Sequence, residues 1–112
     1  SLDANPSAVT AISNDYAFEQ VFSRQVEALA KPGDVFFGIS TSGNSKNILE
    51  AIKTARNLGC KAVGLTGKTG GEMAKVCDFL INIPADDTPR IQEMHALVIH
   101  ILSALIEDEL SK

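Results

Sequence analysis

Hydroxyl side chains are concentrated in one short segment of the chain, residues 40–45. The segment holds a glycine, Gly43, and four hydroxyl side chains, those of Ser40, Thr41, Ser42 and Ser45. It follows an apolar stretch typical of a buried strand and precedes apolar residues at helical spacing. The first N–H groups of a helix are hydrogen-bond donors at the positive end of the helix dipole, and glycine allows close backbone approach. The segment is therefore predicted to bind an anion such as a sugar phosphate.

A simpler explanation of the same residues stays open. Asn44 or Ser45 could merely cap the following helix, with the other hydroxyls facing water. Phosphate binding is favoured because the segment follows a predicted strand, and ligands of open α/β sheets lie outside the carboxyl ends of the strands.

A second polar set lies on a long helix predicted from Arg90 to about Leu110. At about 100° per residue, apolar side chains fill more than half of its circumference, so the helix is predicted to be buried on two sides. One side would pack on the sheet, and the other would meet another subunit or missing chain. The remaining sector holds the small and polar side chains of Gln92, Glu93, Ala96, His100, Ser103 and Glu107.

Two histidines of this helix receive different predictions. His100 carries an imidazole and could be an acid, a base or a metal ligand, although a satisfied core or interface histidine remains the alternative. Gln92 lies two turns away, roughly 12 Å of rise, so the two side chains could meet one ligand only by leaning together. His95 falls at the edge of the apolar arc, where a structural role is predicted.

A glycine-rich segment after another predicted strand resembles part of a nucleotide-binding loop. Gly67-Lys68-Thr69 would match the end of G-x-x-x-x-G-K-[ST], but the position of the first glycine is Ala62. We therefore predict a simple connection with Lys68 in solvent.

The elements that must position these side chains alternate along the chain. Helices are predicted over residues 16–31, 48–58, 72–76 and 90–110, and strands, the first of them buried, over residues 34–39, 61–66 and 78–83. Strands separated by helical crossovers form right-handed βαβ units, so the fold class is α/β with a parallel sheet and flanking helices.

Length and composition exclude several classes of protein. The 112 residues suffice for one domain, and 14 acidic against 10 basic residues give a net charge of −4, which disfavours direct nucleic-acid binding. No apolar run approaches the roughly 20 residues that cross a membrane, and the start does not read as an export signal. Cys60 and Cys77 have no metal-ligand spacing and are predicted to be reduced, partly buried thiols of a cytoplasmic protein.

Three motifs together resemble the phosphoheptose isomerases, which carry the sugar isomerase (SIS) fold, a flavodoxin-like three-layer arrangement. They are GISTSGNS at residues 38–45, LTGKTGG at residues 65–71, and RIQEMH at residues 90–95, which continues through VIHIL at residues 98–102. Asn14-Asp15 fits the same pattern. The resemblance spans nearly the whole chain.

The resemblance implies isomerisation of D-sedoheptulose 7-phosphate to D-glycero-D-manno-heptose 7-phosphate, for the heptose of bacterial lipopolysaccharide. It implies cytoplasmic homotetramers with active sites between subunits. Gln92 would contact substrate and, with His100, ligate zinc, and His100 would also be the catalytic acid or base. The phosphate would be held by Ser40, Thr41, Ser42 and Ser45, and the sugar would be contacted by Asn14 and Asp15.

Two departures from the family pattern stand out. The family has an upstream half with helices, two further strands and a glycine-rich loop, followed by a His and by the Glu expected as base, both expected zinc ligands. Residues 1–112 therefore correspond to the C-terminal portion of the domain, and alone they are predicted to bind phosphate weakly and to lack activity. The loop over residues 85–89 is one residue short, so an expected acidic residue has no certain counterpart, although Asp87 is near.

A non-enzymatic relative offers a different function. The SIS-fold adaptor that binds the bacterial replication initiator DnaA shares the Gln-Glu-Met-His stretch, so residues 92–95 cannot discriminate between the two. That adaptor has an arginine where this chain has Ser42, and a hydroxyl at this position favours the enzyme. A sensor domain within a regulator is less favoured, because no DNA-binding segment accompanies residues 1–112.

Overall fold

The computed structural model describes residues 20–112, in which helices and strands alternate. The elements are α2 (Val21–Leu29), β1 (Val35–Ile39), α3 (Lys46–Asn57), β2 (Lys61–Thr66), α4 (Met73–Val76), β3 (Phe79–Asn82) and α5 (Thr88–Leu110). The three strands form one parallel sheet in the order β1-β2-β3. The α/β class and the parallel sheet predicted from the sequence are therefore confirmed.

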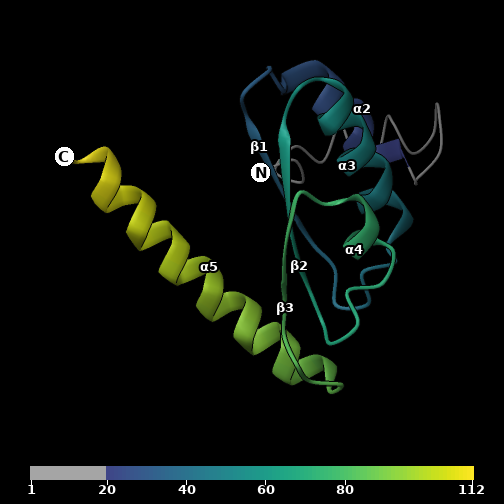
Figure 1. Cartoon of the computed structure of the whole chain (residues 1–112), viewed down its shortest axis with the longest axis vertical. Coiled ribbons are helices and arrows are strands. Elements are labelled where there is room, and N and C mark those ends of the chain that lie inside the picture. Colours follow the sequence, from purple (N-terminus) through teal and green to yellow (C-terminus); the bar gives the residue numbers. More distant parts are fainter. Residues whose placement is uncertain (1–19) are drawn as a thin grey trace.

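The parallel register brings the three strand ends to one edge of the sheet. Ile39 pairs with Leu65, and Thr66 pairs with Asn82. The loops that follow β1, β2 and β3 therefore start side by side, and α5 begins at the same edge (Figure 1). The helix begins at Thr88, two residues before the predicted start, since Pro89 fits the first helical turn, where no N–H is needed.

Helices α2, α3 and α4 cover one face of the sheet. Small side chains of α3 allow close packing, and Ala51, Ile52 and Ala55 are all fully buried. Two apolar clusters form the core: Val26, Ala51, Ala55 and Cys60 in one, and Ile52, Ala62 and Met73 in the other. Burying these side chains is the main favourable contribution to folding of this layer.

Both cysteines are free thiols, as predicted. Cys60 is buried in the core, and Cys77 is half-buried. Burial, together with the neighbouring negative charge of Asp78, raises the pKa of the Cys77 thiol. Because the thiolate is the reactive form of cysteine, the raised pKa disfavours the reactive form of Cys77.

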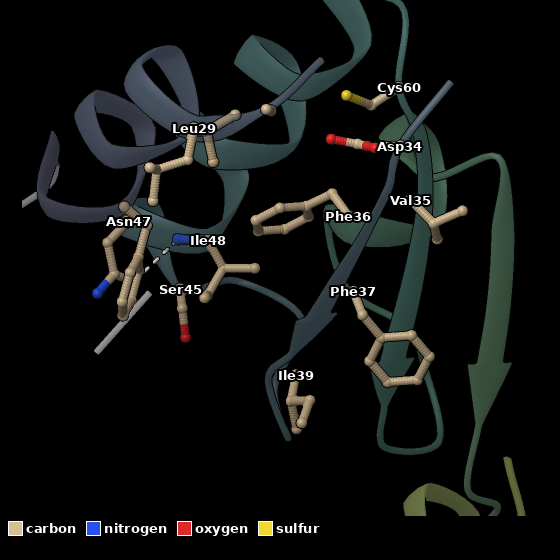
Figure 2. A pocket seen from close by; sticks show the side chains of 13 residues that line it. Leu29, Asp34, Val35, Phe36, Phe37, Ile39, Ser45, Asn47, Ile48 and Cys60 are labelled. Atoms are coloured by element: carbon tan, nitrogen blue, oxygen red, sulfur yellow. Dashed lines mark hydrogen bonds between the residues drawn. The ribbon is translucent and has the colours of Figure 1, made fainter. Parts of the chain in front are cut away.

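The prediction that the first strand is buried is wrong for the described residues. Val35 is 63% exposed, and Phe37 and Ile39 are exposed as well. Successive side chains of a strand point to opposite faces, and the helices cover only one of them. Phe36 points toward Ile48 of α3, whereas Phe37 points away from it (Figure 2).

The prediction that α5 is buried on two sides is also wrong within residues 20–112. Only Ile91 and His95 of this helix are buried. Beyond them the helix runs away from the sheet, on the side opposite to α2 and α3, so no described element can cover its apolar face (Figure 1). That exposed face carries the side chains of Met94, Leu97, Ile101, Leu105, Ile106 and Leu110. Among residues 20–112, no helix has both the length and the apolar character required to cross a membrane.

Candidate functional site

The hydroxyl loop, residues 40–45, is organised around one buried side chain. Ser40 is only 6% exposed. Its Oγ lies 2.9 Å from Ser45 Oγ and 3.4 Å from Ser42 Oγ, and it accepts a hydrogen bond of 3.1 Å from the N–H of Gly43. The structure thus brings together three of the four predicted hydroxyls, and the fourth, that of Thr41, belongs to the same turn.

Helix capping does not explain these hydroxyls. Among the described residues, the Ser45 side chain makes no capping hydrogen bond to α3. The Asn44 Oδ1 atom instead accepts the N–H of Glu72, at 2.8 Å. Both residues named in the simpler explanation are therefore engaged elsewhere, and a hydroxyl that bonds another hydroxyl can rotate to donate to an anion.

The glycine-rich segment, residues 67–71, supports the hydroxyl loop through its backbone. Gly67 N–H donates to the Thr41 carbonyl at 2.9 Å, and Met73 N–H donates to the Gly43 carbonyl at 3.0 Å. Gly43 has a φ of +72°, and a Cβ at this position would overlap the Gly70 carbonyl. The two loops can approach this closely only because they meet glycine to glycine.

Sequence reasoning identified the glycine-rich connection but missed this supporting role. Lys68 is exposed as predicted, and its Nζ lies 3.8 Å from a carboxylate oxygen of Asp86 at the surface. The order of the predicted strands could have indicated this role. The segment follows the neighbouring strand, so it starts at the same sheet edge as the hydroxyl loop.

Gln92 and His100 lie on α5, and both side chains are exposed. Within the described residues, no hydrogen bond joins either of them to the hydroxyl loop or to the other. Asp87 occupies the N-cap position of α5, but its side chain makes no capping hydrogen bond there. The predicted sugar-contacting residues Asn14 and Asp15 lie outside the described residues.

A complete metal site is not formed by residues 20–112, which contain no group of three or more His, Cys, Asp or Glu side chains able to hold an ion. Gln92 and His100 offer an amide oxygen and an imidazole nitrogen. Zinc in a catalytic site takes three protein ligands and a water molecule. By donor chemistry, these two residues fit a zinc site only as two of its ligands, and the others would have to come from outside residues 20–112.

His95 is buried, which confirms the structural role predicted for it. Its Nε2 atom lies 2.8 Å from the carbonyl oxygen of Thr66, the last residue of β2. The hydrogen bond joins α5 to the edge of the sheet where the loops gather.

Comparisons with known proteins agree on one family. The sequence model of the SIS domain family matches residues 2–67. The phosphoheptose isomerase of Aliarcobacter butzleri is 56% identical over 110 residues, which are 98% of this chain and 58% of that protein. The phosphoheptose isomerase of Helicobacter hepaticus is 58% identical over 96% of this chain and 55% of its own length.

Solved structures give the same result. The phosphoheptose isomerase from Neisseria gonorrhoeae superposes with a TM-score of 0.91 at 49% identity, over 94% of this chain and 60% of that one. The isomerase from Francisella tularensis also has a TM-score of 0.91, at 38% identity, over 94% of this chain and 56% of its own. The chain thus spans between half and two thirds of the length of these relatives.

Proposed function

We propose that this chain, which belongs to the SIS domain family, is the C-terminal portion of a phosphoheptose isomerase. The reaction would convert D-sedoheptulose 7-phosphate to D-glycero-D-manno-heptose 7-phosphate, in the cytoplasm, for the heptose of lipopolysaccharide. The names of the relatives above support this proposal. So does the Ser42 hydroxyl, which stands where the initiator-binding adaptor has an arginine.

The observation that carries the proposal is the hydroxyl loop. A buried Ser40 holds the Ser42 and Ser45 hydroxyls together at a strand end. Hydroxyls and backbone N–H groups at the start of a helix bind the phosphate of a neutral sugar without a lysine clamp. We assign phosphate binding to Ser40, Thr41, Ser42 and Ser45, and sugar contacts to Asn14, Asp15 and Gln92.

The chemistry requires two groups that exchange protons with the substrate. Aldose–ketose isomerisation proceeds when a base removes a proton from one carbon and an acid serves the neighbouring oxygen, usually through an enediol. We assign His100 to one of these roles because an imidazole can both donate and accept a proton. The second group would come from the upstream half of the protein.

Zinc is proposed as the metal, with Gln92 and His100 as two of its ligands. A bound zinc ion would act as a Lewis acid on the substrate oxygens. Because residues 20–112 do not form a whole metal site, the remaining ligands would lie in the upstream half. This assignment rests on the resemblance and on the chemistry of the two donors.

The free edge of the sheet supports an upstream half. Among the described strands, β1 pairs only with β2. Along its other edge runs a groove of about 780 Å³, walled by side chains of α2, β1 and α3 (Figure 2). Parallel sheets are covered on both faces, and native proteins seldom leave a long apolar edge open. We propose that upstream strands complete the sheet at β1.

Subunit association would complete the site on the other side. The exposed apolar face of α5 is a surface that soluble proteins bury against a partner. We propose that it packs against copies of itself in a homotetramer, with active sites between subunits.

The net charge of −4 gives no reason to expect direct nucleic-acid binding.

Turnover by the full-length protein tests this function. We expect conversion of sedoheptulose 7-phosphate, and we expect His100→Ala to lower kcat by about 10²- to 10⁴-fold, the usual contribution of a general acid or base. Asp108→Asn, an exposed change two turns further along α5, is the control and should leave kcat unchanged. Full turnover by His100→Ala would return His100 to a structural role. No turnover by the folded, zinc-supplied wild type would overturn the enzyme and favour the initiator-binding adaptor.

A further inference from the structure

The attachment of α5 to the sheet depends on very few side chains. Ile91 and His95, one turn apart, are the only buried residues of this helix in the described structure. We call Ile91 the apolar anchor and His95 the polar anchor of the helix. These two side chains fix the position of Gln92 and His100 relative to the hydroxyl loop.

The polar anchor ends at a carbonyl that joins three elements. Thr66 is fully buried, and its carbonyl oxygen accepts the Ile83 N–H at 3.0 Å and lies 2.8 Å from His95 Nε2. A carbonyl oxygen has two lone pairs, so both hydrogen bonds can form at once. The end of β2, the residue after β3 and helix α5 are thereby held at one atom.

The same point connects to the hydroxyl loop. Gly67, the residue after Thr66, donates its N–H to the Thr41 carbonyl at 2.9 Å. A Cβ on Gly67 would lie 2.7 Å from that carbonyl oxygen and 2.8 Å from Ile91 Cδ1, so the apolar anchor packs here too. The hydroxyl loop is therefore linked to α5 through two hydrogen bonds, one between Thr41 and Gly67 and the other between Thr66 and His95, because Thr66 and Gly67 are neighbours in the chain.

The ring nitrogens of His95 show that the histidine does more than fill space. A carbonyl oxygen can only accept, so Nε2 must carry the proton. The other nitrogen, Nδ1, is buried and has no hydrogen-bond partner among residues 20–112. An apolar side chain would fill this position without leaving a polar atom unpaired. The Nε2 hydrogen bond is therefore what distinguishes histidine from an apolar residue here.

We propose that His95 is a positioning residue that fixes how α5 is rotated about its axis, and where it lies along that axis, relative to the hydroxyl loop. Its Nε2–H bond to Thr66 orients Gln92 and His100, which lie three residues before it and five residues after it, toward a substrate whose phosphate the loop holds. The catalytic consequence rests on the proposed isomerase function. The hydrogen bond fixes the position of α5 whatever reaction the protein catalyses.

A matched pair of variants of the full-length protein tests the proposal. In His95→Gln the amide Nε2 can donate to Thr66, whereas His95→Met has a similar length and no donor. We expect His95→Met to lower kcat by about tenfold to a hundredfold, the usual cost of an ångström-scale misplacement. KM should change less than kcat, because the phosphate contacts in the hydroxyl loop stay intact and only the Gln92 contact moves with α5. His95→Gln should recover most of kcat.

Crystal structures of wild type and both variants give a readout that needs no turnover. We expect α5 to be rotated or displaced relative to residues 40–45 in His95→Met and to keep its place in His95→Gln. Wild-type kcat and helix position in His95→Met would overturn the proposal, and so would equal loss of folded protein in both variants. If the wild type shows no turnover, the isomerase proposal fails, while the helix positions still decide the role of His95.

Discussion

The hydroxyl loop and the outer half of α5 belong to one proposed active site but differ in how they are held. The loop is fixed within this chain, because Ser40 is buried and Gly67, Glu72 and Met73 all donate hydrogen bonds to residues 41–44. After His95, most of the large apolar side chains of α5 are exposed in the described structure. The proposed phosphate site is therefore built within this chain, whereas the proposed acid–base and metal chemistry would need groups beyond residues 20–112.

The difference follows from how each region gains stability. The two loops belong to consecutive βαβ units of a parallel sheet, so their close approach is a consequence of local topology. A helix gains most of its stability from packing its apolar face against other elements. Such a face can be specified in sequence even when its partner lies in another segment or subunit.

The largest expected effect comes from breaking the contact between the two loops. In Gly43→Ala, the new methyl group would meet the Gly70 carbonyl at a positive φ. Gly33→Ala is the control, because Gly33 also has a positive φ, +90°, but has nothing within 4 Å of its Cβ position. We expect a loss of about 3 kcal/mol or more in the free energy of unfolding for Gly43→Ala. For Gly33→Ala we expect about 1–2 kcal/mol.

Urea unfolding of both variants of the full-length protein, together with sugar-phosphate binding by calorimetry, makes this comparison. Binding should be lost in Gly43→Ala and retained in Gly33→Ala. Equal losses of stability would mean that backbone strain alone matters and that the loops do not support each other.

A smaller effect is expected at the exposed face of α5. Leu105→Asp would place a charge where we propose that subunits meet, and it would remove about 2 kcal/mol of apolar burial from each subunit. Sedimentation should then show the tetramer dissociating at concentrations where wild type and Glu109→Gln remain associated. Unchanged assembly would show that this face of α5 is not a subunit interface.

The sequence predicted the elements well because their apolar residues are periodic and several of the elements end at strong signals. Pro32-Gly33 follows the end of α2, Gly59 follows α3, and strand β2 has the bounds expected from its apolar residues. The predicted burial of β1 and α5 was wrong, because an apolar face shows that a surface is to be buried but does not show whether residues 20–112 bury it. Val35 in β1 and Leu97 in α5 are the clearest cases.

The candidate site was predicted unevenly for a related reason. Residue types identified the hydroxyls of Ser40, Ser42 and Ser45, which the structure places around one buried oxygen. They could not reveal that Gly67 supports the loop or that His95 meets Thr66, since backbone hydrogen bonds leave little trace in side-chain type. The roles of Gln92 and His100 as substrate and metal contacts stay predictions, because both side chains are exposed on the part of α5 that lies away from the hydroxyl loop's hydrogen bonds.

The smallest expected effect separates binding from support within the loop itself. Ser42 is the exposed hydroxyl of the network, and its Oγ accepts only the Asn44 N–H at 3.1 Å and lies 3.4 Å from Ser40 Oγ. Ser42→Ala should weaken sugar-phosphate binding about fivefold to tenfold, by loss of about 1 kcal/mol from one hydrogen bond. It should change the free energy of unfolding by less than about 0.5 kcal/mol.

Thr69→Ala is the matched control, because Thr69 carries an exposed hydroxyl in the neighbouring glycine-rich segment and bonds only the Gly71 N–H, at 3.4 Å. Calorimetric titration of the full-length protein with sedoheptulose 7-phosphate should show wild-type affinity for Thr69→Ala. If both variants bind alike, the Ser42 hydroxyl does not contact the phosphate. Phosphate binding by the loop would then have to rest on Ser40, Thr41 and Ser45 alone, and the contrast between the two regions would be weaker than we propose.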